Sequence, residues 1–325
     1  MKDLSIGKLY GLQHISTRRG TFTCLALDHR QNLRRALNPA DPASVSDADL
    51  SRFKLEVTAA LADLGTAVLL DPEFSAAQAI AAGVIPGSTA FIVAVESTGY
   101  GGASTARQSQ ILPGWSVEKA KRMGASMIKL LVYYHPDSST TAEIEAFVRD
   151  VAEECAHHDL GLMLEPLSYS LDAGKKLSSA EKREVVTETA RRLVIPGVDV
   201  LKAEFPLDIT EEPDESAWAT ACAGISTTSP VPWIVLSAAV DYETYVRQVE
   251  TACRAGASGS AAGRAVWQEA VSLDGEERLD FLRTTGRERL AHLTALCSEL
   301  GKPVSDFYHA EAPFDWYKTY KDGNG

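Results

Sequence analysis

The segment VDVLKAEFP, residues 198–206, places a lysine inside an otherwise apolar strand pattern. Side chains alternate between the two faces of a strand, so Val198, Val200 and Lys202 fall on one face. A lysine in a position suited to valine is desolvated, which lowers the pKa of its ammonium group and leaves a neutral amine that attacks carbonyls. The alternative is an ion pair with Glu204, two residues further along the same face. This segment alone leaves both interpretations open.

Short apolar segments of the same kind recur along the chain and alternate with segments of helical periodicity. Residues 50–64, 144–155 and 245–253 show the helical spacing most clearly. Strand and helix alternate eight times, which predicts a parallel sheet joined by crossover helices. The predicted strands are FTCLALDHR (22–30), AVLLDP (67–72), FIVAVES (91–97), SMIKLLVYY (126–134), GLMLEPLSY (161–169), VDVLKAEFP (198–206), PWIVLSAAV (232–240) and GSAAGRAVW (259–267).

Eight such units predict an α/β protein with one closed (β/α)8 TIM barrel. The chain has no GxGxxG after a strand and no P-loop, which argues against an open nucleotide-binding sheet. We expect residues 1–325 to form a single domain with its barrel core at about 22–270. Apolar spacing over residues 4–17 predicts a leading helix that plugs one end. Residues from about 276 to 325 are expected to form a helical and aromatic-rich extension that packs on its own barrel or on a neighbouring subunit.

The composition limits the classes of partner. A net charge of −12 argues against nucleic-acid and anionic-membrane surfaces, because both require positive charge. Five scattered cysteines without a CxxC pair are typical of reduced thiols in a cytosol. No apolar run reaches the roughly 18 residues of a membrane span, and the N-terminus lacks a signal-peptide core. We therefore expect a cytoplasmic homo-oligomer that binds a small molecule.

Charged residues gather at the carboxyl ends of the predicted strands, where (β/α)8 barrels carry their functional groups. Such side chains are rarely buried without partners, so their concentration on one rim indicates a shared cavity of coupled charges. Two neighbouring lysines disfavour each other's protonation, which supports a neutral amine. A purely structural ion-pair network is the alternative. The residues are Asp28, Asp71, Glu96, Lys129, Glu165, Lys202 and Glu204.

The last two predicted strands end instead in small residues and one arginine. Loops after these strands are the usual phosphate site of the barrel, because backbone N–H groups can approach an anion there. Arg264 adds a fork of donors. Together with the lysines, Ser237, Gly263 and Arg264 predict an anionic carbonyl substrate. The histidines include the adjacent His157 and His158 but no HxxxH or HxH pair, so we expect neither a metal nor another cofactor.

These segments resemble, in order and approximate spacing, the class I tagatose 1,6-bisphosphate aldolase family, the DeoC/LacD-like Schiff-base aldolases. The resemblance runs from about residue 22 to 270 and implies a metal-free aldolase that cleaves a ketose bisphosphate into dihydroxyacetone phosphate and glyceraldehyde 3-phosphate. It rests on LALDHR, LLDPEF, ESTGY, IKLLVYYHPD, LEPLSY, LKAEFP, LSAAV and AGRAVW.

The resemblance also implies a role for each matched residue. Lys202 corresponds to the Schiff-base lysine, whose iminium accepts electrons as C3–C4 breaks. Glu165 corresponds to the acid/base that takes the C4 hydroxyl proton, and Lys129 to the cation that depresses the pKa of Lys202. Asp28 orients Lys129 or the substrate, and Glu96 is a supporting carboxylate. The phosphate is expected at Ser237, Gly263 and Arg264.

Two alternatives remain open. The 6-deoxy-6-sulfofructose 1-phosphate aldolases share the barrel and the lysine, and PWIVLSAAVD with GASGSAAGRAVW is similar to theirs, whereas ESTGYGG is closer to the tagatose type. Arg264 does not separate the two, because phosphate and sulfonate are both tetrahedral oxyanions. Phe205 and the long loop 209–229 depart from the family pattern near the distal pocket. A non-catalytic sugar-phosphate sensor is the alternative of another class, and the presence of every expected catalytic residue weighs against it.

Overall fold

Eight parallel strands form a closed barrel in the computed structural model, which describes residues 1–238, 240–318 and 320. Their order around the barrel is β10-β11-β2-β3-β4-β7-β8-β9. Each predicted strand segment overlaps one of them, and only β4 begins outside its segment, by one residue, so the predicted (β/α)8 barrel is confirmed. The strands are β2 Phe22–Ala26, β3 Ala67–Leu70, β4 Ala90–Ala94, β7 Met127–Tyr133, β8 Gly161–Leu167, β9 Val200–Ala203, β10 Trp233–Leu236 and β11 Gly259–Ala262.

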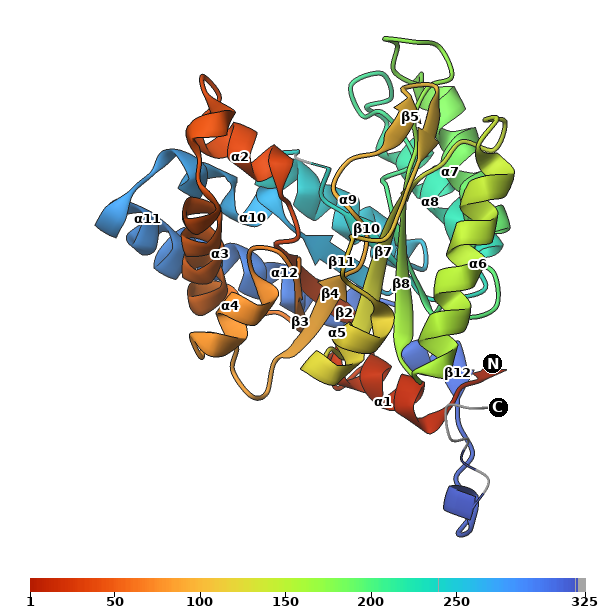
Figure 1. Ribbon diagram of the computed structural model, residues 1–325. Helices are drawn as coiled ribbons and strands as arrows, with labels where there is room; N and C mark the ends of the chain where they lie inside the picture. Colours follow the sequence, from red (N-terminus) through yellow and green to blue (C-terminus); the bar gives the residue numbers. More distant parts are fainter. Residues whose placement is uncertain (239, 319, 321–325) are drawn as a thin grey trace.

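Helices surround the barrel (Figure 1). In α3, Leu50, Phe53, Val57 and Leu61 are buried at the spacing expected for one helix face, and Ser46 closes a capping box with Asp49. The helices are α2 Gln31–Leu37, α3 Asp47–Leu61, α4 Ala76–Ala81, α5 Val117–Met123, α6 Thr141–His157, α7 Ser179–Leu193, α8 Glu215–Thr228, α9 Tyr242–Arg254, α10 Arg264–Trp267, α11 Gly275–Phe281 and α12 Arg287–Leu300. Shorter turns are η1 Pro42–Ser44, η2 Gln268–Ser272, η4 Val304–Asp306 and η5 Trp316–Lys318, and a π-helical segment, η3, spans Leu282–Gly286.

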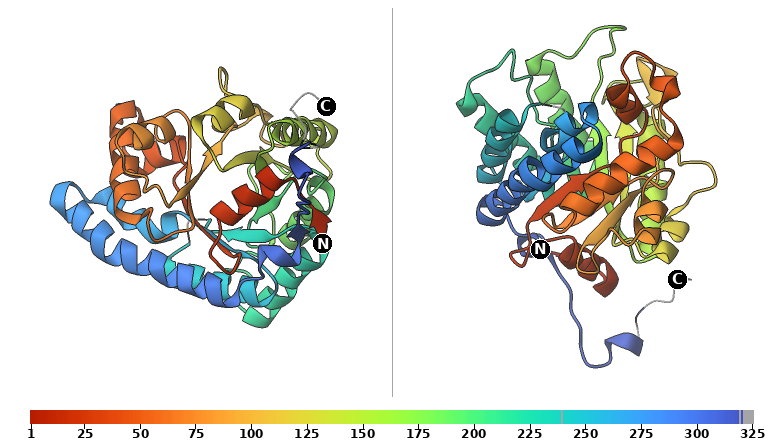
Figure 2. Two further views of the ribbon diagram at one scale, coloured as in Figure 1. Left: turned by 90° about the horizontal axis from the view of Figure 1, so that it is seen from below. Right: turned by 90° about the vertical axis from the view of Figure 1, so that its left-hand side faces the viewer.

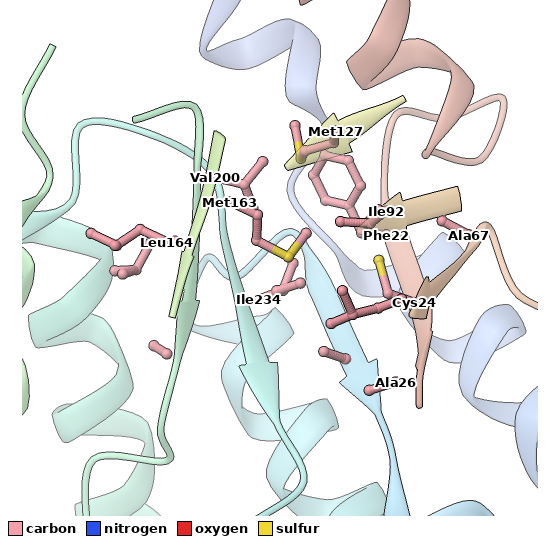
Figure 3. Close-up of a cluster of buried hydrophobic side chains, with 14 of the residues drawn as sticks. Phe22, Cys24, Ala26, Ala67, Ile92, Met127, Met163, Leu164, Val200 and Ile234 are labelled. Atoms are coloured by element: carbon pink, nitrogen blue, oxygen red, sulfur yellow. The ribbon is translucent and has the colours of Figure 1, made fainter. Parts of the chain in front are cut away.

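Apolar side chains fill the barrel below its carboxyl end. Met127, Met163 and Val200 belong to the buried cluster shown in Figure 3. Side chains two residues apart on a strand share a face, so each of these residues is followed on the same face by a charged one. These charged residues are Lys129 on β7, Glu165 on β8 and Lys202 on β9. A closed apolar layer therefore supports a layer of charges above it.

The amino-terminal end of the barrel is covered by α1 Ile6–His14 (Figure 2, left). Leu12 and Ile15 are fully buried, and Gly11 allows close contact because a Cβ there would lie 2.6 Å from the Ser126 carbonyl oxygen. The expected plugging helix is therefore confirmed. No helix in the part of the chain that the structure describes is both long and apolar enough to cross a membrane.

The last part of the C-terminal extension lies at the same end of the barrel as α1, whereas α12 packs along the outside of the barrel against β2 and α9 (Figure 1). Strand β12 Tyr308–His309 pairs with β1 Lys2–Asp3, and the Tyr308 hydroxyl donates to the Asp199 carbonyl oxygen at 2.9 Å. The chain then extends below the barrel, with Phe314 fully exposed (Figure 1). The extension thus packs partly on its own barrel, at the end opposite the carboxyl ends of the strands.

Candidate active site

A cavity of about 620 Å³ opens at the carboxyl ends of the barrel strands. Its lining includes all eight residues that the sequence singles out as a site, contributed by seven strands and the loops that follow them. They are Asp28, Glu96, Lys129, Glu165, Lys202, Ser237, Gly263 and Arg264. Residues that are up to 236 positions apart in the chain therefore share one cavity.

Lys202 is almost completely buried and pairs with a carboxylate from the neighbouring strand. Its Nζ donates to Oε2 of Glu165 at 2.9 Å, and the lysine is 3% exposed. The alternative pair with Glu204 is not formed, because the carboxylate of Glu204 accepts from the backbone N–H of Ser168 at 2.6 Å. The Lys202 amine consequently has an acid/base group within hydrogen-bonding distance.

Lys129 occupies the centre of the charged layer. Its Nζ lies 2.6 Å from Asp28, 2.7 Å from Glu96 and 2.9 Å from Glu165. Burial alone would lower the pKa of Lys129, but the three carboxylates outweigh it and hold this pKa well above the ordinary value. Lys129 is therefore a permanent cation, and it shares Oε2 of Glu165 with Lys202.

Asp28 and Glu96 both contact the ammonium group of Lys129. Burial would raise the pKa of Asp28, but Lys129 and Lys202 outweigh it and hold this pKa well below its ordinary value. Glu96 also accepts from the backbone N–H of Leu131 at 3.1 Å, and Arg30 donates to its carbonyl oxygen at 2.7 Å. These contacts fix two carboxylates whose orientation decides where Lys129 points.

Asp71 has a different place from the one expected on the rim. Its carboxylate pairs with the fully buried Lys54 of α3 and accepts from the backbone N–H groups of Glu73 and Phe74. Asp71 follows the last residue of β3, so the alternation of the strand no longer determines where its side chain points. It fastens a helix to the barrel and does not line the cavity.

Ser237, Gly263 and Arg264 come together on one side of the cavity. A Cβ on Gly263 would lie 3.4 Å from Oγ of Ser237, so glycine leaves space beside this hydroxyl. The Nε of Arg264 is buried without a hydrogen-bond partner, and burial lowers the pKa of Arg264. Within the described chain, its guanidinium forms no ion pair. Such a desolvated, unpaired cation favours an anionic ligand.

His29 is a cavity residue that the sequence analysis did not single out. Its ring meets Trp267 edge-on at 5.4 Å, and a Cβ on Gly263 would lie 3.2 Å from its Cε1. Burial lowers the pKa of His29 to about 3, so the imidazole is neutral around pH 7. Its position directly after Asp28 in LALDHR, at the carboxyl end of a predicted strand, could have identified it as a cavity residue.

Three other residues that line the cavity were harder to identify from the sequence. Tyr133 shares the inward face of β7 with Lys129, which strand alternation predicts, whereas Tyr100 belongs to an irregular segment without periodicity. Arg35 projects from α2 into the lining, and its guanidinium donates to Asn32 at 3.2 Å. Arg35 forms no ion pair with any described residue.

The carboxylates of the cavity are grouped around lysines. Within residues 1–238, 240–318 and 320, no group of three or more His, Cys, Asp or Glu side chains has an arrangement that could hold a metal ion. The arrangement instead combines a buried amine, a shared carboxylate and a permanent cation beside an unpaired arginine. It suits covalent chemistry on an anionic carbonyl compound.

Comparison with known proteins gives one consistent family. The family model for DeoC/LacD family aldolases matches residues 22–269. Tagatose 1,6-diphosphate aldolase 2 of Enterococcus faecalis is 31% identical over 333 residues, covering 96% of this chain and 98% of that protein. Tagatose 1,6-diphosphate aldolase of Listeria monocytogenes is 29% identical over 332 residues, covering 93% and 95%.

Solved structures of aldolases share the fold. An archaeal fructose 1,6-bisphosphate aldolase superposes with a TM-score of 0.60 at 22% identity, covering 90% of this chain and 99% of that chain. A Schiff-base-forming fructose 1,6-bisphosphate aldolase superposes with a TM-score of 0.57 at 20% identity, covering 89% and 99%.

Proposed function

Since the chain belongs to the DeoC/LacD family of aldolases, we propose that it reversibly cleaves a ketose 1,6-bisphosphate, such as tagatose 1,6-bisphosphate, through a Schiff base on Lys202. The products are dihydroxyacetone phosphate and glyceraldehyde 3-phosphate. The observation that carries this proposal is the buried Lys202 amine 2.9 Å from Glu165, beside the cation of Lys129.

The first half of the reaction forms the iminium. The neutral amine of Lys202 attacks C2 of the open-chain ketose, and the carbonyl oxygen takes a proton from Glu165. The Glu165 carboxylate then takes the extra proton from the carbinolamine nitrogen and passes it to the hydroxyl, which leaves as water and gives the iminium. Lys129 favours the neutral amine at the start, because its own charge is fixed by three carboxylates.

The second half breaks the carbon–carbon bond. The Glu165 carboxylate removes the proton of the C4 hydroxyl, C3–C4 breaks, and its electron pair moves to the iminium nitrogen, giving an enamine and the free aldehyde. Protonation of C3 and hydrolysis of the resulting iminium release dihydroxyacetone phosphate and restore the Lys202 amine. Asp28 and Glu96 keep Lys129 in place throughout.

Two unpaired arginines support a substrate with anionic groups. Arg264, with Ser237 and Gly263, is suited to the phosphate nearest the Schiff base, because β10 neighbours β9 in the barrel. Arg35 offers a second guanidinium to the same cavity. Both groups accept a sulfonate as readily as a phosphate, so 6-deoxy-6-sulfofructose 1-phosphate belongs in the substrate panel.

The test is trapping of the Schiff base. Wild type, Lys202→Met and the control Lys175→Met, which changes an exposed lysine paired with Asp172, are treated with borohydride and dihydroxyacetone phosphate. Intact mass and peptide mapping are expected to show an adduct on Lys202 in the wild type and in Lys175→Met, and no adduct in Lys202→Met. A folded wild type without an adduct would contradict the mechanism.

A substrate panel then identifies the sugar. Coupled assays measure aldehyde release from tagatose 1,6-bisphosphate, fructose 1,6-bisphosphate and 6-deoxy-6-sulfofructose 1-phosphate. We expect the highest kcat/KM for a ketose 1,6-bisphosphate. Binding without release of triose phosphate would instead support a sugar-phosphate sensor, and preference for the sulfonate would replace the proposed substrate.

A further inference from the structure

One wall of the cavity is built by a segment that leaves the barrel. Residues 96–111 depart after β4, form a hairpin of β5 Gly101–Ala103 and β6 Ala106–Gln108, and return before α5. The base of the segment is closed by a bridge between Glu96 and Ile111. The hairpin rises above the barrel, and β5 is exposed along its whole length (Figure 1). Its own strands therefore supply no apolar core that would hold it in place.

Arg107 on β6 joins this hairpin to the barrel by stacking among three tyrosines. Its guanidinium carbon lies 4.4 Å from the ring centre of Tyr100, 4.6 Å from that of Tyr169 and 5.2 Å from that of Tyr133. The three rings come from three separate segments: the hairpin connection, the loop after β8 and the end of β7. A planar guanidinium suits several aromatic faces at once, and each such contact is stabilising.

Polar contacts fix the arginine in this position. Its Nε donates to the Ser104 carbonyl oxygen at 3.0 Å, and its backbone N–H donates to the Tyr169 hydroxyl at 3.4 Å. That hydroxyl in turn donates to Ser138 at 2.8 Å. Among the residues with described positions, Arg107 has no carboxylate partner, so the aromatic rings are its main electrostatic partners.

The tyrosines around Arg107 lie on one side of Lys202, and the proposed anion site, formed by Ser237, Gly263 and Arg264, lies on the other. Along the closed barrel, β9 is flanked by β10 and β11 in one direction and by β8 and β7 in the other. Ser237 and Arg264 follow the first pair, whereas Tyr133 and Tyr169 come from the second. A ketose that is bound at C2 by Lys202, with its nearer phosphate at Arg264, directs its remaining carbons toward the tyrosines.

We propose that Arg107 is a positioning residue that holds Tyr100 and Tyr133 as the cavity wall facing the aldehyde half of the substrate. This inference rests on the proposed aldol cleavage. Arg107 does not line the cavity itself, whereas both tyrosines do. Its loss is therefore expected to impair reactions of the full ketose and to spare the half-reaction with dihydroxyacetone phosphate.

The experiment compares Arg107→Ala and Arg107→Lys with the control Gln108→Ala. Gln108 is the adjacent residue of β6, and its side chain donates to Glu143, outside the tyrosine cluster. For Arg107→Ala we expect KM for the ketose bisphosphate to rise about tenfold or more, since several cation–π contacts are lost. Solvent exchange of the C3 proton of dihydroxyacetone phosphate should stay near the wild-type rate. For Arg107→Lys, KM for the ketose bisphosphate should lie between those of the wild type and Arg107→Ala, because lysine retains the charge and lacks the planar guanidinium.

Amide hydrogen exchange provides a readout that needs no substrate. Exchange over residues 97–109 should accelerate in Arg107→Ala and not in Gln108→Ala. Unchanged exchange, or an equal loss in the half-reaction and in cleavage, would overturn the positioning role. Failure of the wild type to form an adduct would contradict the proposed aldolase mechanism instead, and the exchange measurement would still decide whether Arg107 holds the wall.

Discussion

The Nζ atom of Lys202 lies 2.9 Å from Oε2 of Glu165, and the same oxygen lies 2.9 Å from Nζ of Lys129. One carboxylate oxygen thus forms ion pairs with two lysines, and the two lysines differ in their surroundings. Lys129 has two further carboxylates and keeps its proton, whereas among the described residues Glu165 is the single carboxylate paired with Lys202. Glu165 is therefore the acid/base group within reach of the Lys202 amine that the proposed mechanism requires.

Replacing Glu165 with glutamine should therefore remove proton transfer and leave binding nearly intact. We expect kcat for cleavage to fall by about 10²- to 10⁴-fold, the usual contribution of a general acid/base, with little change in KM. Borohydride trapping on Lys202 should become slow, because formation and dehydration of the carbinolamine also need the carboxyl group. Steady-state kinetics and time-resolved intact mass measure both effects.

Glu204→Gln is the matched comparison, since Glu204 also lines the cavity and is two residues from Lys202. Its carboxylate accepts from a backbone N–H, a bond that the amide oxygen of glutamine can also accept. The loss in kcat should be much smaller. If Glu204→Gln were as damaging as Glu165→Gln, the assignment of the acid/base to Glu165 would be wrong.

A second prediction concerns the stability of the charged layer. Lys129→Met leaves Asp28, Glu96 and Glu165 without their common cation, and breaking a buried ion pair in this way costs about 3–5 kcal/mol. The urea midpoint should fall accordingly. Adding Asp28→Asn to Lys129→Met should recover part of this loss, because among the described residues Asp28 has no ion pair other than that with Lys129, whereas Glu96 also pairs with Arg30 and Glu165 with Lys202. A double variant less stable than the single one would contradict this account.

The two pKa shifts in this layer define its pH range. The depressed pKa of Asp28 contributes stability that is lost only as pH falls below its ordinary value of 3.8, and the raised pKa of Lys129 contributes stability that is lost only as pH rises above 10.5. Between these limits neither group adds a pH dependence to the stability of the wild type, whereas in Lys129→Met the buried Asp28 loses the cation that favours its ionised form, so the deficit of the variant relative to the wild type should shrink as pH falls. Urea unfolding at several pH values checks this.

The alternation of strand side chains explains why so much of the site was predictable. Lys129, Glu165 and Lys202 each follow a buried apolar residue by two positions, so their inward direction was fixed by the strand pattern. The partner of Lys202 was not fixed in this way. Glu204 is near in sequence, but the adjacency of β8 and β9 in the barrel brings Glu165 to the amine.

Two features beyond strand ends escaped prediction, because strand alternation no longer determines where their side chains point. Asp71 begins just after β3 and turns to Lys54 of α3, a contact set by how the helix packs. The segment 96–111 has neither helical nor strand periodicity, so nothing in its sequence links Tyr100 to Tyr133 or Arg107.

A third prediction tests the anion site with two related ketones. Arg264→Ala should raise by about tenfold or more the concentration of dihydroxyacetone phosphate needed for half-maximal trapping, since a charge-assisted contact is lost. Trapping of dihydroxyacetone, which has no phosphate, should be unaffected. Arg264→Lys should recover only part of the affinity because it lacks the planar fork. An equal effect on both ketones would show that Arg264 acts on the site as a whole and not on the phosphate.

The last prediction concerns the buried imidazole of His29. Its pKa falls from 6.5 to about 3 on folding, chiefly through burial. Below about pH 6.5 the unfolded chain therefore binds a proton that the folded protein does not, and stability decreases as pH falls toward 3, by up to about 1.4 kcal/mol per pH unit. His29→Gln lacks this term, because the amide of glutamine does not titrate. Urea unfolding between pH 7 and 4 should thus show the wild type losing stability more steeply than the variant, and parallel curves would mean that His29 is charged in the folded protein.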